Sequence, residues 1–156
     1  MTNSIAEKVG ALGHRLPPVS APAGSYVGTV RVENLLYVSG QISLQDGKPA
    51  FLGRLGAELD VEQGRQAARA AGLGVLAQIA AATQDRLAAV RRVAKLSVFV
   101  ASAPDFARQP DVANGASELM VAVFGDRGRH ARAAVGVAAL PRGVAVEVEA
   151  VVELED

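Results

Sequence analysis

The sequence predicts an α+β fold in which a mixed, mainly antiparallel sheet carries two helices packed on one face. Three observations indicate this class. Two adjacent β-rich runs lie near the start of the chain, two helix-forming segments flank a further β-rich run, and apolar residues alternate strictly along the last segment. The expected order is β-β-β-α-β-α-β-β, and its 156 residues fit a single domain.

A short amphipathic helix is expected before the sheet begins. Ile5 and Val9 recur at helical spacing, and Gly13 is a plausible stop. The proline-rich stretch that follows predicts an extended connector. We therefore expect two parts, an N-terminal helix and connector over residues 1–20 and the main domain over residues 21–156.

The first strands are expected to form a meander. Tyr26–Val32 and Leu35–Ile42 are β-rich runs separated by only two residues, which predicts a tight hairpin. Asp46 and Gly47 mark a second turn, after which residues 49–55 are expected to return as a third strand.

Two helices with a strand between them should follow. The segment from Val61 to about Ala82 has good helix propensity, and Asp60 is a plausible N-cap. Small and β-branched residues form one apolar stripe along it: Ala67, Ala71, Val75, Ile79 and Ala82. A strand is expected over Val93–Val100, and a second helix from about Val112 to Phe124 should stop at Gly125.

The chain should end in two strands, over residues 131–139 and 144–154, which the turn at residues 140–143 joins into a hairpin. By the period of two, the even-numbered residues of the last strand share one face, and Glu147 and Glu149 lie on the other. Since the helices cover one side of the sheet only, this second face is either solvated or buried between subunits. Burial between subunits would make the protein an oligomer.

Several classes of function are disfavoured by composition. The formal charge is zero, so binding to nucleic acid or to an anionic membrane is not expected. The chain has no cysteine and only two distant histidines, His14 and His130, which argues against a metal site, and no cofactor is indicated. No signal peptide or membrane-spanning stretch is apparent, so we expect a cytoplasmic protein.

Four segments carry a resemblance to a known family: APAGSY, NLLYVSGQI, KLSVFVAS and HARAAVGVAALPRGVAVEVEA. In this order they resemble the RidA/YjgF family of reactive-intermediate deaminases, which has the older label endoribonuclease L-PSP. The N-terminal helix and the HARAAVGV segment resemble a divergent, slightly longer branch of the family more than its founding deaminases. The resemblance implies a chorismate-mutase-like subunit fold and a homotrimer with pockets between neighbouring subunits.

The resemblance also implies a site built around Arg132 and Glu147. Arg132 matches an arginine that binds the carboxylate of a small metabolite, because its planar guanidinium donates two parallel hydrogen bonds. The alternative is an arginine paired with a glutamate across the sheet. Glu147 matches a glutamate that places a water molecule, and a plain interfacial salt bridge is its alternative.

Four further residues match the border of the family's pocket: Tyr26, Ser39, Gly40 and Ala134. Gly40 and Ala134 would offer backbone N–H groups to the ligand carboxylate, and glycine allows a close approach. The chain departs from the family pattern at His130, which replaces the usual proline and lies either beside the pocket or in a loop. Asn114 is a possible stand-in for the family's pocket asparagine.

The function implied by the resemblance is hydrolysis of reactive 2-imino or enamine acids to 2-keto acids and ammonia. The alternative, which the departures favour, is a regulatory trimer that binds a keto acid without turning it over. A ribonuclease is disfavoured because the chain is neutral, has few aromatic residues and lacks paired catalytic histidines.

Overall fold

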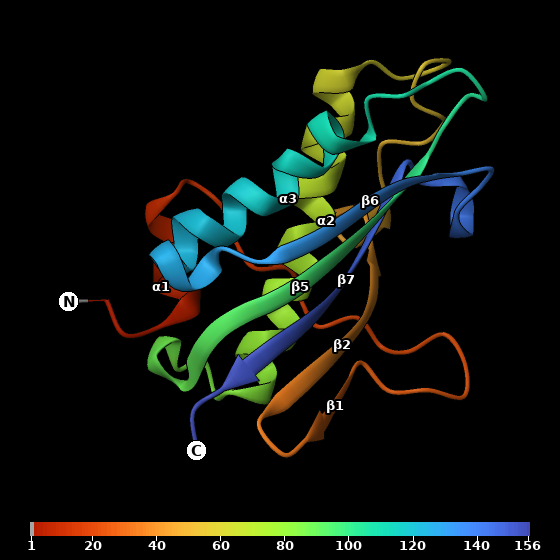
Figure 1. Cartoon of the computed structure of the whole chain (residues 1–156). Coiled ribbons are helices and arrows are strands. Elements are labelled where there is room, and N and C mark those ends of the chain that lie inside the picture. The colour runs from red at the N-terminus through yellow and green to blue at the C-terminus, as the bar shows by residue number, and fades with distance from the viewer. Residues whose placement is uncertain (1) are drawn as a thin grey trace.

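A five-stranded sheet organises the chain, and the computed structural model describes residues 2–156 (Figure 1). The strands are β1 (Thr29–Val32), β2 (Leu35–Ile42), β5 (Val90–Ala101), β6 (Ala131–Val137) and β7 (Val146–Leu154). Their order across the sheet is β1-β2-β7-β5-β6. All neighbours are antiparallel except β5 and β6, which are parallel. The predicted mixed, mainly antiparallel sheet is confirmed.

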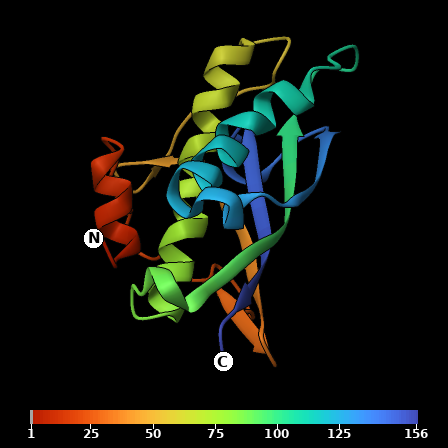
Figure 2. The ribbon, with the colours of Figure 1, turned by 60° about the vertical axis from the view of Figure 1, so that its left-hand side comes forward.

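The two long helices lie together on one face of this sheet (Figures 1 and 2). The helices are α1 (Ile5–Ala11), α2 (Val61–Ala82) and α3 (Gln109–Phe124), with short 3-10 turns η1 (Leu87–Ala89), η2 (Gly125–Gly128) and η3 (Pro141–Gly143). Helix α1 contacts both α2 and α3. No helix of the described chain combines the length and the apolar character that a membrane span requires.

Helix α2 begins where the sequence predicts. The Asp60 carboxylate accepts a hydrogen bond from the Gln63 backbone N–H at 2.8 Å, and the Gln63 side-chain oxygen accepts one from the Asp60 N–H at 2.9 Å. This capping box satisfies two backbone donors at the start of the helix. The helix then presents its small residues to the sheet and to α3.

Helices α2 and α3 approach each other closely at Gly115. A Cβ atom at this position would overlap the Arg65 carbonyl oxygen of α2. Gly115 is buried between Asn114 and Ala116 in the middle of α3. The absence of a side chain at Gly115 therefore permits the close approach of α3 to α2 at this point.

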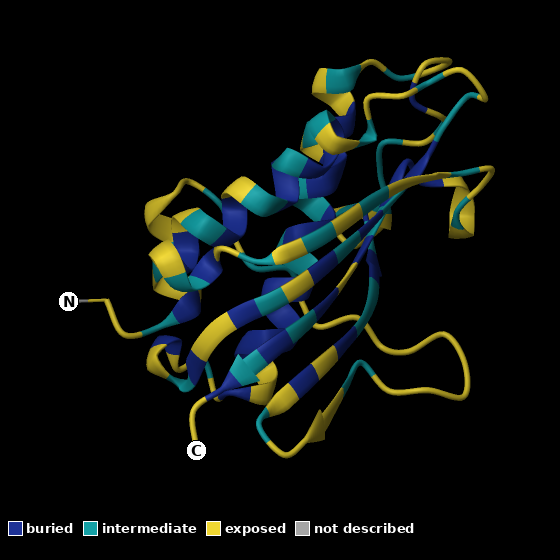
Figure 3. Ribbon diagram, viewed as in Figure 1, coloured by how far each residue is buried: buried dark blue, intermediate teal, exposed yellow. Residues whose placement is uncertain are grey.

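The core lies between the helices and one face of the sheet, as the alternating burial along the strands shows (Figure 3). On β7, Val146, Val148 and Val152 are fully buried, whereas Glu149 is exposed. The predicted alternation is thus confirmed within β7. It fails just before the strand, because Ala145 is also fully buried and its N–H donates to the carbonyl of Phe51.

Two predicted elements are wrong. Residues 49–55 form no strand of the main sheet: β3 (Leu44–Gln45) and β4 (Lys48–Pro49) make a separate two-stranded ribbon, and Leu52 and Leu55 form only isolated bridges. The C-terminal strands form no hairpin either. Strand β5 lies between β6 and β7, so residues 138–145 cross over its end instead of folding back in a tight turn.

Candidate functional site

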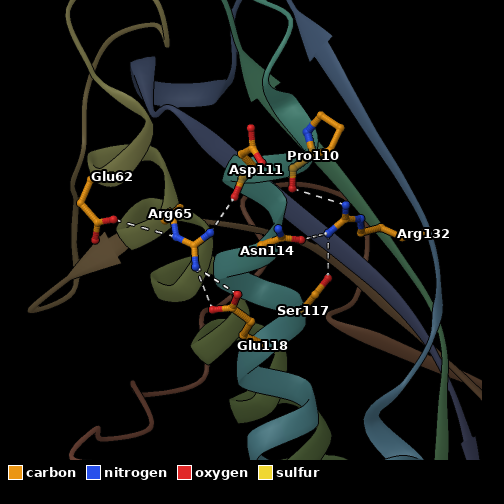
Figure 4. A network of polar contacts seen from close by, with 8 residues as sticks. All are labelled: Glu62, Arg65, Pro110, Asp111, Asn114, Ser117, Glu118 and Arg132. Carbon is orange, nitrogen blue, oxygen red and sulfur yellow. Dashed lines mark hydrogen bonds and ion pairs between the residues drawn. The ribbon is translucent and has the colours of Figure 1, made fainter.

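Arg132 lies on the edge strand β6 and points toward α3 (Figure 4). Its Nη1 donates to Asn114 Oδ1 at 2.8 Å and to Ser117 Oγ at 3.1 Å, and its Nη2 donates to the Pro110 carbonyl at 3.4 Å. These three acceptors come from successive turns at the start of α3. The helix therefore fixes the plane of the guanidinium.

One edge of the Arg132 guanidinium remains available. Among residues 2–156, Nε donates no hydrogen bond and no carboxylate lies within salt-bridge distance of Arg132, so the expected alternative of a glutamate partner across the sheet is not found. The Nε–H group and one N–H of Nη2 point the same way. This pair matches the spacing of two carboxylate oxygens.

Helix α3 is also held from its other side, by Arg65 of α2. The Arg65 guanidinium bonds both oxygens of Glu118, at 2.9 and 3.0 Å, and donates to the Asp111 carbonyl at 3.3 Å (Figure 4). Glu62 lies 3.9 Å away on the same helix as Arg65. An isolated exposed ion pair contributes little to stability, but these contacts together tie α3 to α2 close to the acceptors of Arg132.

Glu147 belongs to a different region, a cavity of about 350 Å³ beside β2. Among its lining residues are Tyr26, Gly28, Gly40, Gln78, Arg142 and Glu147. Register between β2 and β7 is interrupted between Val38 and Gln41, so Ser39 and Gly40 form a bulge. A Cβ atom at Gly40 would overlap a Glu147 carboxylate oxygen, which means that only glycine permits this contact.

The environment of Glu147 favours its protonated form. Partial burial raises the pKa of the Glu147 carboxyl above its usual value, and the nearby Glu149 carboxylate raises it further. Because this pKa is raised by folding, the charged carboxylate costs stability at pH values above it. The cost disappears as the pH falls below 4.5, the ordinary carboxyl value.

A comparison of the whole chain with known proteins decides its family. The model described as Endoribonuclease L-PSP matches residues 18–154. The chain belongs to this family, also called RidA/YjgF. Protein TCP17 of Trypanosoma cruzi is 51% identical over 153 residues, which are 97% of this chain and 95% of that protein.

Two solved structures of high similarity cover nearly the whole chain. A protein of unknown function from Agrobacterium tumefaciens is 44% identical with a TM-score of 0.91, covering 97% of this chain and 92% of its own. A putative endoribonuclease from Shewanella oneidensis is 30% identical with a TM-score of 0.92, covering 97% and 100%. This RidA/YjgF chain therefore shares its overall fold with both.

The expected site residues of this RidA/YjgF chain form two separate groups. Tyr26, Gly40 and Glu147 line one cavity, and Arg132 and Ala134 are not among its lining residues. Arg132 pairs in register with Leu96, whose side chain is buried beneath the helices, whereas Glu147 pairs with Phe99. Arg132 and Glu147 therefore lie on opposite faces of the sheet, with β5 between their strands. Ser39 is not among the lining residues of the Glu147 cavity, and its hydroxyl donates to the Val27 carbonyl at 2.6 Å.

The two departures from the RidA/YjgF pattern both lie beside Arg132. Asn114 is its acceptor at 2.8 Å, so the possible stand-in asparagine contacts the predicted ligand-binding arginine. His130 precedes β6 in a loop, as one of the two expected alternatives had it, and its Nε2 lies 2.8 Å from Ser117 Oγ. Sequence reasoning missed Ser117, although its spacing of three from Asn114 places both on one helix face.

Proposed function

We propose that the chain hydrolyses reactive 2-imino or enamine acids to 2-keto acids and ammonia in a pocket completed by two copies of itself. Arg132 and the backbone of Ala134 would come from one copy, and Tyr26, Gly40 and Glu147 from its neighbour. The observation that carries this proposal is the arginine fixed by α3 with one bidentate edge available. Its separation from Glu147 within one chain is the reason for invoking a second copy.

The uncovered face of the sheet supports an oligomer, for which we propose a trimer. Proteins of this family are typically oligomeric. Val30, Tyr37 and Val151 are neighbours across β1, β2 and β7 on this face. The exposed fraction is 50% for Val30 and 46% for Tyr37. Contiguous exposed apolar side chains of this kind are typical of a protein–protein interface.

Each residue has a defined role in the proposed reaction. Arg132 would bind the substrate carboxylate and so fix the adjacent C=N carbon, which removes entropy from the attack by water. Glu147 would orient that water and accept its proton, and a raised pKa makes its carboxylate a better proton acceptor. Water adds to the C=N carbon, and the proton taken by Glu147 passes to the nitrogen. The C–N bond then breaks as the hydroxyl loses its proton, so that ammonia leaves and the keto acid remains.

The second candidate is a regulatory protein that binds a keto acid without turnover. The separation of Arg132 and Glu147 favours it, because carboxylate binding needs only the arginine whereas hydrolysis needs both residues. A ribonuclease gains no support from a chain with zero net charge, whatever the family's description.

Glu147→Gln tests the proposed chemistry. In a coupled assay with imines generated in place, we expect turnover to fall about 30- to 100-fold, because an amide cannot accept the proton of the attacking water. Binding of pyruvate, measured by calorimetry, should persist. The variant should be at least as stable as the parent at pH 7, since it removes a partly buried charge.

Glu149→Gln is the matched control. Glu149 lies two residues away on the same face but is exposed, and it does not line the cavity that holds Glu147. Its loss removes only the smaller of the two causes that raise the Glu147 pKa, so turnover should stay within about twofold of the parent. A parent protein that binds pyruvate but accelerates no imine hydrolysis would establish the second candidate instead.

A further inference from the structure

Ser117 joins Arg132 to a histidine. The Ser117 hydroxyl oxygen accepts from Arg132 Nη1 at 3.1 Å and lies 2.8 Å from His130 Nε2. The other ring nitrogen, Nδ1, lies 2.6 Å from the Gly128 carbonyl oxygen. Serine, histidine and arginine come from α3, from the loop before β6 and from β6, so the contact spans three segments.

The direction of each hydrogen bond in this series, from Gly128 through His130 and Ser117 to Arg132, follows from the chemistry of its donor and acceptor. A carbonyl only accepts, so His130 Nδ1 must carry a proton and donate to Gly128. In the neutral ring Nε2 then has a lone pair and accepts from the Ser117 hydroxyl. Arg132 only donates, so the same hydroxyl oxygen accepts from it. The proton of the Ser117 hydroxyl therefore points at His130 Nε2, and a lone pair of the same oxygen points at Arg132 Nη1.

The charge on His130 is coupled to its surroundings. Burial lowers the pKa of His130 below its usual value, and the Arg132 guanidinium lowers it further, although the bond to Gly128 acts in the opposite direction. Other charges near these segments are engaged elsewhere: Arg127 donates to the Val90 carbonyl, Arg129 pairs with Asp126, and Glu118 pairs with Arg65. Arg132 is thus the charge that His130 senses most directly.

We propose that Ser117 and His130 are positioning residues that hold the Arg132 guanidinium and make its affinity for an anion depend on protonation of His130. This inference rests on the proposed function of Arg132 as a carboxylate-binding residue. A carboxylate bound at Arg132 offsets the positive charge that disfavours imidazolium. Linkage then requires that a protonated His130 strengthens carboxylate binding. The usual family proline at position 130 offers no such group.

The proton arrangement is measurable without any ligand. With only His14 and His130 in the chain, His14→Gln leaves one imidazole to observe by ¹⁵N and ¹H NMR. We expect the neutral ring of His130 to be protonated at Nδ1 and to titrate below the usual histidine value. Arg132→Gln should move this titration to higher pH. An Nε2-protonated ring with the same titration in both proteins would overturn the inference.

Binding of pyruvate tests the coupling itself. From pH 8 to pH 5.5 we expect the dissociation constant of the parent to fall about three- to tenfold, since a shift of one pKa unit corresponds to a factor of ten. In the Glu147→Gln background, where position 147 no longer titrates, His130→Gln should show a flat profile. Ser117→Ala should bind about three- to tenfold more weakly at pH 8 because Nη1 loses one acceptor, and Ser117→Thr should restore binding because it retains the hydroxyl.

Glu147 adds a pH dependence of its own, so the binding of pyruvate is also measured against pH in Glu147→Gln. The dissociation constant should still fall between pH 8 and pH 5.5 in this variant. If His130→Gln kept the parent's slope, the coupling would be refuted while the role of Arg132 stood. If Arg132→Gln bound pyruvate as well as the parent does, or the parent bound none, the proposed function would fail. The NMR titration would then still test, on its own, the hydrogen bonds that link His130, Ser117 and Arg132.

Discussion

Arg132→Gln is expected to weaken pyruvate binding by about 10²- to 10⁴-fold and to reduce imine hydrolysis by a similar factor. Two charge-assisted hydrogen bonds are lost, each contributing ~1.5–3 kcal/mol, and a factor of ten corresponds to about 1.4 kcal/mol. Arg132→Lys should recover little of this, because an ammonium group cannot form the two parallel bonds. Calorimetry with pyruvate measures the first effect and the coupled imine assay the second.

Arg129→Gln is the control for Arg132. Arg129 lies three residues earlier and pairs with Asp126, but its side chain is 74% exposed. Removing it changes the net charge by the same amount, and it should leave affinity within about twofold. Equal losses in the two variants would mean that general electrostatic attraction, not a fixed guanidinium, binds the anion.

Gly115→Ala is expected to destabilise the fold by about 3 kcal/mol in urea unfolding. The new methyl group would overlap the Arg65 carbonyl oxygen, so one backbone segment must move. This cost exceeds the roughly 1 kcal/mol that alanine gains over glycine inside a helix. Movement of α3 would also displace Asn114 and Ser117 from Arg132, so the folded fraction should bind pyruvate more weakly.

The control for Gly115 is Gly10→Ala in α1. Gly10 is also helical, but a Cβ atom there meets nothing within 4 Å. This variant should therefore be neutral or gain up to about 1 kcal/mol. A neutral result for Gly115→Ala as well would contradict the close packing of α2 on α3.

Local features of the fold could be predicted from the sequence because each has a local cause. Asp60 caps α2 through a residue three positions away, and the β7 pattern depends only on alternate residues. Strand order has no local cause. The insertion of β5 between β6 and β7 depends on pairings across more than thirty residues, so a short connection was taken for a hairpin.

In the candidate site, too, some features could be predicted from local sequence and others depend on the arrangement of strands and helices. Arg132, Glu147 and Gly40 could be proposed from motifs, but the separation of Arg132 from the other two could not, because it follows from the strand order. Ser117 carried no motif and gained its place only through the packing of α3 against β6. Gly115 was missed for a similar reason, because its close approach to the Arg65 carbonyl becomes visible only when α2 and α3 are seen together.

In the proposed pocket, Arg132 and Glu147 act together from different copies of the chain. Arg132→Ala and Glu147→Gln, each nearly inactive alone, should regain activity when co-expressed with different tags and purified as mixed oligomers. If copies mix at random, roughly a quarter of the pockets would combine an intact arginine with an intact glutamate, and turnover should reach about that share of the parent's. Mixed oligomers with no more activity than the single variants would contradict a pocket shared between copies.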